Sequence, residues 1–203
     1  MKIVALFIAC CAAAVLSGCV GDFLKPKDDP TQFYILRPIP PKADWKADVP
    51  AGVQVNILPF SLPSYLGRHQ MVVLESGGRV EISEFNRWAE LPVSGFNRVL
   101  LDNISALLPS VDAYAYPSVS PRADALTLRL FVDEFLGSLN GEVVLKGMWV
   151  LYSPKDKKSA EKKFKFSAKA SGSFDSYAEA MNALIFQLCQ QISTGIAGLT
   201  KTK

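Results

Sequence analysis

Residues 126–170 read LTLRLFVDEFLGSLNGEVVLKGMWVLYSPKDKKSAEKKFKFSAKA, and this stretch carries the strongest fold signal in the chain. Three long segments within it alternate apolar and polar residues, as strands with one buried face do: residues 126–135, 142–152 and 162–170. The Asn140-Gly141 pair is the strongest short-range signal for a hairpin turn. The stretch therefore predicts an antiparallel meander of three strands.

Shorter strand patterns lie on the N-terminal side of this meander. They are residues 32–37, 53–57, 70–75, 79–83 and 111–116. Ser76-Gly77-Gly78 separates two of them, and it predicts a hairpin turn because glycine tolerates positive φ.

Two segments change to a helical period. After Pro92, apolar residues recur at steps of three and four until Pro109, which predicts a helix with one buried face. Ser176-x-x-Glu179 is a capping-box pattern, and it predicts the start of a second amphipathic helix that runs to Leu199. The helices are separated by strands. We therefore expect a single α+β domain in which one mostly antiparallel sheet is covered by two amphipathic helices.

The N-terminus has the pattern of a bacterial lipoprotein. Leu16-Ser17-Gly18-Cys19 closes an apolar segment that follows Lys2, which predicts a signal peptide over residues 1–18 and acylation of Cys19. An ordinary secretory signal or a membrane-spanning helix is the alternative, but the apolar run is shorter than the roughly 20 residues a span needs. Residues 19–31 are polar and contain proline, so we expect a flexible tether, with the folded body over residues 32–203. Val20 is not a retention signal for the inner membrane, which favours the periplasmic face of an outer membrane.

Composition excludes several classes of function. The formal net charge is +3, so nothing suggests nucleic-acid binding. Of the four cysteines only Cys189 remains in the body, and its apolar helix predicts a buried, inert thiol. The chain lacks a phosphate-binding loop, the common metal-binding motifs and a G-x-S-x-G elbow, and it has one histidine. We expect no cofactor, no metal site and no catalytic residues.

Lysines gather near the loop at residues 154–158. They are Lys155, Lys157, Lys158, Lys162, Lys163 and Lys165, against Asp156 and Glu161. Two interpretations stay open. The lysines form a solvated hairpin tip, or they contact anionic lipid headgroups, where each cation is worth about 1 kcal/mol.

Three patches together resemble the PqiC/YmbA family, the auxiliary lipoproteins of MCE-type ABC transport systems. The patches are residues 34–36 (YIL), residues 57–70 (ILPFSLPSYLGRHQ) and residues 86–92 (NRWAELP). The second is similar to the family's V-x-L-P-x-x-L-P-x-Y-L-D-R-P-Q, and the third to its R-W-A-E-P-L. Gly67, His69 and the order Leu91-Pro92 depart from these patterns, which puts the loop geometry in question.

The resemblance implies a non-catalytic outer-membrane lipoprotein that binds the periplasmic MCE protein of an ABC lipid transport system. Tyrosine, arginine and tryptophan are favoured at interface centres, so the candidate partner-binding residues are Tyr65, Arg68, His69, Gln70, Arg87, Trp88 and Glu90. By analogy with ring-shaped MCE assemblies, a homo-oligomer is expected. The alternatives are a scaffold lipoprotein for an outer-membrane β-barrel and a periplasmic hydrolase that depends on His69. For Trp88 and Tyr65, simple packing at a sheet edge is an equal alternative, and Arg87 and Glu90 could form only a local salt bridge.

Overall fold

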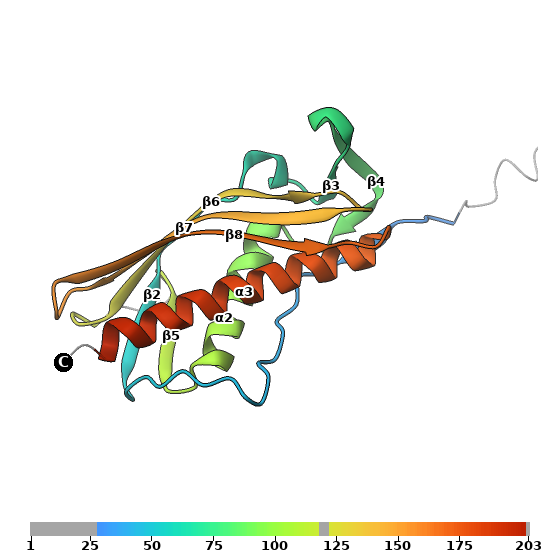
Figure 1. Cartoon of the computed structure of the whole chain (residues 1–203). Coiled ribbons are helices and arrows are strands. Elements are labelled where there is room, and N and C mark those ends of the chain that lie inside the picture. Colours follow the sequence, from blue (N-terminus) through green and yellow to red (C-terminus); the bar gives the residue numbers. More distant parts are fainter. Residues whose placement is uncertain (1–27, 118–121, 202–203) are drawn as a thin grey trace, which may run out of the picture. The chain divides into compact units, whose positions relative to one another are not determined.

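The structure is a computed structural model that describes residues 28–117 and 122–201 (Figure 1). Residues Thr31–Lys203 group into one compact unit. The predicted signal peptide, the acylation site at Cys19 and most of the predicted tether lie outside the described residues. Within the described residues, no helix combines the length and hydrophobicity needed to cross a bilayer.

The larger of two sheets has five strands in the order β5-β2-β6-β7-β8. Their bounds are Val111–Ala115 for β5, Val53–Ile57 for β2, Leu126–Gly137 for β6, Glu142–Ser153 for β7 and Lys158–Lys169 for β8. The last three form the predicted antiparallel meander. Strand β2 pairs in parallel with both β5 and β6, so the sheet is mixed.

The smaller sheet has three strands in the order β1-β4-β3. Their bounds are Gln32–Tyr34 for β1, Val80–Trp88 for β4 and Gln70–Leu74 for β3. The predicted hairpin of β3 and β4 is present, and its turn is the short 3-10 segment η2 (Ser76–Gly78), where Gly77 and Gly78 both have positive φ. Strand β1 runs parallel to β4. The α+β class is confirmed, but the expectation of a single, mostly antiparallel sheet is corrected to two mixed sheets.

Two helices carry the apolar stripes that the sequence predicts, α2 (Pro92–Leu107) and α3 (Phe174–Lys201). Pro92 is the first residue of α2, a position where its missing N–H costs nothing. Helix α3 begins before the predicted capping box. Ser173 is the capping residue, because its Oγ accepts the backbone N–H of Ser176 at 3.1 Å while the Ser176 Oγ accepts the N–H of Ser173 at 3.4 Å. The box predicted at Ser176 and Glu179 is therefore wrong by three residues.

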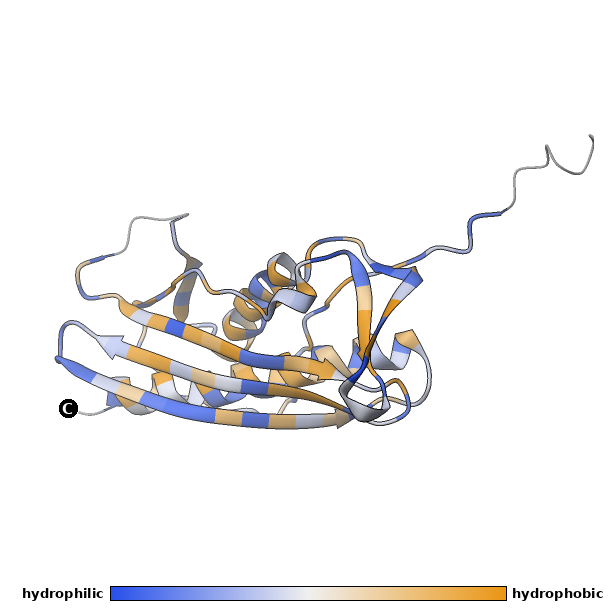
Figure 2. Ribbon diagram, turned by 90° about the horizontal axis from the view of Figure 1, so that it is seen from above, coloured by the Kyte–Doolittle hydropathy of each residue, from blue (hydrophilic) through white to orange (hydrophobic). Residues whose placement is uncertain are grey.

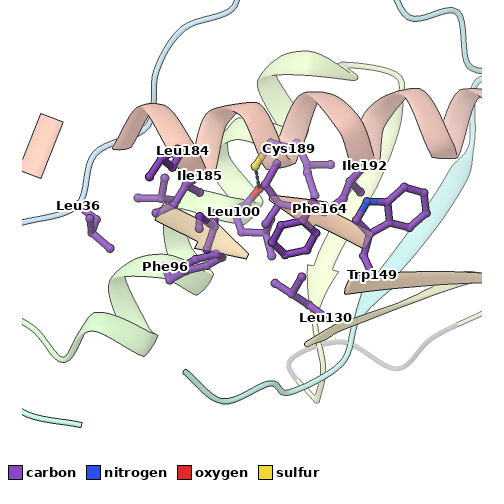
Figure 3. Packing of buried hydrophobic residues seen from close by; sticks show 14 of the residues in the cluster. Leu36, Phe96, Leu100, Leu130, Trp149, Phe164, Leu184, Ile185, Cys189 and Ile192 are labelled. Carbon is purple, nitrogen blue, oxygen red and sulfur yellow. Dashed lines mark hydrogen bonds between the residues drawn. The ribbon is translucent and has the colours of Figure 1, made fainter. Parts of the chain in front are cut away.

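Both helices pack on the same face of the larger sheet, and their apolar stripes meet there (Figures 1 and 3). Phe96 of α2 makes edge-to-face contacts with Phe135 of β6 and with Phe60, at centroid distances of 5.5 and 5.4 Å. On the α3 side, Trp149 Nε1 donates to Gln191 Oε1 at 2.8 Å. Among the described elements, no helix lies over the opposite face of β6, β7 and β8 (Figure 2).

Cys189 lies in the middle of this core, as predicted, and its side chain is fully buried. Burial raises the pKa of its thiol, because the thiolate would lose its hydration. Since the folded-state pKa is the higher one, the stabilisation is complete below the unfolded thiol pKa of about 8.5 and is lost as the pH rises above it.

We expect the free energy of unfolding to fall by about 1 kcal/mol more in the natural chain than in Cys189→Ala between pH 7.5 and 9.5. Urea unfolding at a series of pH values measures this difference. Parallel pH profiles for the two proteins would contradict it.

Candidate functional site

The two sequence patches that suggest partner binding lie side by side. The start of β3 pairs with the end of β4, where Gln70 is opposite Arg87. Just before this pair, the Trp88 N–H donates to the His69 carbonyl at 2.6 Å. The His69 ring donates from Nδ1 to the Trp88 carbonyl at 3.0 Å, since a carbonyl can only accept. Residues 65–70 and 86–90 therefore form one surface region.

Two of the candidate residues point inward. Trp88 is 2% exposed and belongs to the core. Tyr65 lies in the short 3-10 helix η1 (Ser64–Leu66), where it is half-buried and its hydroxyl accepts the Phe135 N–H at 3.1 Å. Burial raises the pKa of Tyr65, and the hydrogen bond from Phe135 partly offsets this. Both side chains support the region from below and present little area to a partner.

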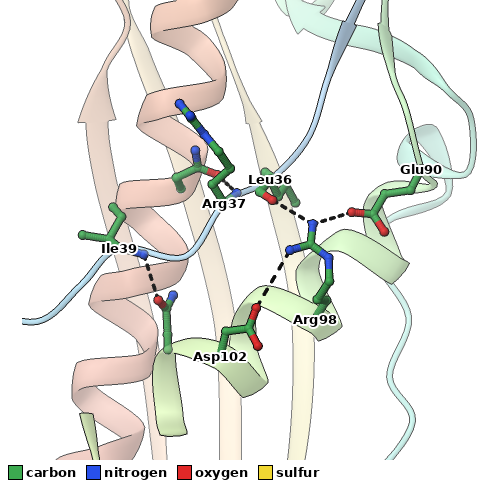
Figure 4. A network of polar contacts seen from close by, with 8 residues as sticks. Leu36, Arg37, Ile39, Glu90, Arg98 and Asp102 are labelled. Carbon is green, nitrogen blue, oxygen red and sulfur yellow. Dashed lines mark hydrogen bonds and ion pairs between the residues drawn. The ribbon is translucent and has the colours of Figure 1, made fainter. Parts of the chain in front are cut away.

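Glu90 is part of a polar network at the start of α2 (Figure 4). Its Oε1 accepts from Arg98 Nη2 at 2.5 Å, and the same nitrogen donates to the Leu36 carbonyl at 2.8 Å. A second guanidinium nitrogen of Arg98 lies 3.9 Å from Asp102 Oδ2. Glu90 thus orients Arg98, which holds the segment after β1 against α2.

Two buried asparagines fix the same segment (Figure 4). Asn182 of α3 accepts the Arg37 N–H at 2.9 Å, and Asn103 of α2 accepts the Ile39 N–H at 3.0 Å. Sequence reasoning missed both residues and Arg98. The available signal was an asparagine inside each apolar stripe, because a buried amide needs a partner.

The remaining candidates are accessible, and they adjoin exposed apolar side chains. Arg68 and His69 are exposed, while Gln70 and Arg87 are half-buried. Phe33 of β1 is opposite Arg87 and is 67% exposed.

Two further exposed apolar side chains are near Phe33 and Arg87 in the chain. Phe85 lies two residues before Arg87 in β4, in the stretch between Ile82 and Arg87 where the pairing with β3 shifts register, and Ile35 follows directly after β1. Phe85 is 44% exposed and Ile35 is 48% exposed. We call this surface the aromatic face, and it consists of Phe33, Ile35, Gln70, Phe85 and Arg87, with Arg68 and His69 beside it. Its three apolar members escaped sequence reasoning.

The aromatic face offers apolar packing and hydrogen-bond donors. Arg87 Nε donates to the Glu84 carbonyl at 3.1 Å, which holds the guanidinium over the sheet. Among the residues that the structure describes, no three histidine, cysteine, aspartate or glutamate side chains gather closely enough to hold a metal ion.

Comparison with known proteins identifies the family and the fold. A family model described as ABC-type transport auxiliary lipoprotein component matches residues 34–193. A crystal structure titled an uncharacterized protein is similar with a TM-score of 0.62 and 22% identity, covering 83% of this chain and 97% of that one. Protein XCC0632 from Xanthomonas campestris, of the family DUF330, is similar with a TM-score of 0.62 and 16% identity over the same shares of the two chains. No curated protein matches the chain by sequence.

Proposed function

The chain belongs to the family of ABC-type transport auxiliary lipoprotein components, and on this basis we propose that it is a non-catalytic, lipid-anchored subunit of an MCE-type lipid transport system. Its body docks the periplasmic MCE partner, and its anchor is in the periplasmic leaflet of the outer membrane. Acylated Cys19 provides the anchor after removal of residues 1–18, and residues 19–31 connect it to the body. The compact unit that begins at Thr31 supports this layout.

The aromatic face is the observation that carries the docking role. Exposed apolar side chains that cluster beside arginine are typical of binding surfaces, since a soluble surface usually scatters them. Phe33 and Phe85 supply area with few rotatable bonds, and Arg87 and Arg68 supply rigid donor groups. The partner surface would therefore combine an apolar centre with carboxylates.

The face is also held rigidly, which favours tight docking because little side-chain and loop entropy is lost on binding. Tyr65 and Trp88 support it from the core side. Arg98, Asn103 and Asn182 fix the segment that follows Phe33. Seven residues were predicted from the sequence to bind the partner. Three of them support the aromatic face from the protein side (Tyr65, Trp88 and Glu90). Three are accessible to a partner (Arg68, His69 and Arg87), and Gln70 lies between the two groups.

We expect the double variant Phe33→Ser/Phe85→Ser to capture the MCE partner at least tenfold less well than the natural chain. Both side chains are exposed, so the fold should persist, while the loss of two interface aromatics costs more than about 1.4 kcal/mol of binding. To measure capture, the lipoprotein is purified in detergent from crosslinked cell envelopes, and the amount of MCE protein recovered with it is quantified.

Tyr116→Ser is the matched control, because Tyr116 is 47% exposed just after β5, at the edge of the larger sheet and away from the aromatic face. It should leave capture unchanged. Failure of the natural chain to recover any MCE protein, or recovery of an outer-membrane β-barrel in its place, would overturn the proposed partner. Equal capture by the double variant would overturn the assignment of the aromatic face.

A further inference from the structure

Strand β7 carries apolar side chains on both of its faces. The face toward α3 bears the core residues Val143, Leu145, Trp149 and Leu151. The face away from the helices bears Val144, Met148, Val150 and Tyr152. A sheet with one solvated face normally places polar residues there. The outer side of β7 is therefore more apolar than the fold requires.

An open hollow of about 710 Å³ lies on this outer side, and it is lined by residues of β6, β7 and β8. Phe131, Met148 and Lys163 stand in one row across the three strands, because Met148 is paired with both of the others. Phe131 is 49% exposed. An exposed aromatic ring and a thioether thus line the hollow.

The charge around the hollow is predominantly positive. Lys146, Lys163 and Lys165 line it, with Asp133 as the acidic residue among its lining groups. Lys146 is paired with Lys165 across the strands, so two cations stand side by side. Like charges in such a pair repel unless an anion lies between or over them. The lysines of the adjoining hairpin at residues 155–158 extend the positive surface, which complements an anionic one.

We propose that the outer face of β6, β7 and β8 lies against an anionic phospholipid surface, with Phe131, Met148 and Tyr152 at the level of the headgroups and the lysines on lipid phosphates. Mixed aromatic, apolar and lysine side chains are the composition of interfacial membrane contacts. This inference rests on the proposed function, because it assumes that the lipid anchor holds the body at a membrane. It adds an orientation of the body on the bilayer.

The anchor favours a membrane over an acidic protein as the occupant. The tether proposed over residues 19–31 has 13 residues, and a flexible chain of that length would span about 20 Å on average. A body held so close to a bilayer meets a high effective concentration of headgroups, so a surface that binds vesicles only weakly when free is sufficient for docking. Three lysines together provide about a hundredfold preference for anionic over neutral lipid.

The test uses the compact unit from Thr31 onward, which contains every described strand and helix and lacks the anchor. We expect it to co-sediment with phosphatidylglycerol vesicles at least tenfold more strongly than with phosphatidylcholine vesicles, and to be released at about 0.5 M NaCl. The triple variant Lys146→Gln/Lys163→Gln/Lys165→Gln should bind the anionic vesicles about a hundredfold less well.

The matched control is Arg37→Gln/Lys42→Gln/Lys46→Gln, which makes the same change in net charge with exposed residues on the helical side of the sheet. It should keep binding within a factor of about five, the effect of one unspecific cation. Equal loss in both triple variants, or equal binding to the two kinds of vesicle, would overturn the proposal. The double variant Phe33→Ser/Phe85→Ser should still bind vesicles. If the protein captures the MCE partner normally but does not bind anionic vesicles, the proposed membrane contact is overturned and the proposed function is not.

Discussion

A Gly147→Ala variant is expected to lose about 3 kcal/mol of unfolding free energy, although it adds a single methyl group. Gly147 is opposite Val132, immediately before the bulge at which β6 gains an extra residue. The bulge brings the partner strand so close that an added Cβ would overlap the Phe131 carbonyl oxygen and lie 2.8 Å from the Phe164 ring. Backbone cannot move aside as a flexible side chain can, so the strands must separate locally.

Thermal and urea unfolding measure the effect, with a fall in melting temperature of about 10 °C for a domain of this size. Gly198→Ala is the control. An added Cβ at Gly198 of α3 meets no atom within 4 Å, and alanine in a helix is worth about 0.5–1 kcal/mol over glycine. That variant should be more stable than the natural chain. A Gly147→Ala protein of natural stability would show that the bulge can relax.

A Tyr177→Phe variant is expected to lose about 3 kcal/mol as well, because one hydroxyl joins the two sheets. The Tyr177 hydroxyl accepts the Gly137 N–H of β6 at 3.2 Å and donates to the Val72 carbonyl of β3 at 3.1 Å. Tyr177 is 1% exposed and Val72 is 2% exposed, so water does not replace the hydroxyl. Phenylalanine leaves a buried N–H and a buried carbonyl unpaired, each at about 1–3 kcal/mol.

Tyr65→Phe is the matched control for this hydroxyl, since Tyr65 is half-buried and accepts one N–H, that of Phe135. It should lose about 1 kcal/mol. Alkaline pH provides a second readout. Burial raises the pKa of Tyr177, so its contribution is complete below the unfolded phenol pKa of about 10 and declines above it. The stability difference between the natural chain and Tyr177→Phe should therefore shrink above pH 10, and a constant difference would contradict the assignment.

Side-chain periodicity predicted most of the elements. Alternation over residues 126–170 was sufficient for the meander of β6, β7 and β8, and the step of three and four after Pro92 was sufficient for α2. The start of α3 was misplaced because serines at 173 and 176 can both accept a capping hydrogen bond, and the sequence does not say which one does. The pairing of β1 with β4 and of β2 with β5 and β6 was missed. The alternation of apolar and polar residues indicates which face of a strand a residue occupies, but it does not indicate which strand lies beside it.

For the candidate site too, the sequence predicted which segments are involved but not which of their side chains are exposed. Residue types and the family resemblance pointed to residues 65–70 and 86–90, and the structure brings these two segments together through the pairing of Gln70 with Arg87. Which side chains face solvent depends on packing. Trp88 is turned into the core by the register of β4, whereas Phe33 is left exposed because nothing in the described chain covers that side of β1.

By itself, the sequence determined the α+β class, the order of most elements along the chain, the buried thiol at Cys189 and the family resemblance. These depend on local periodicity and on residue types, which a single chain displays directly. Only the tertiary structure decided that there are two mixed sheets, that Arg98 and two asparagines fix the segment after β1, and that an aromatic face and a lysine-lined hollow are exposed. Those features join residues far apart in the chain, and long-range pairing is set by the packing of whole elements, which no local pattern specifies.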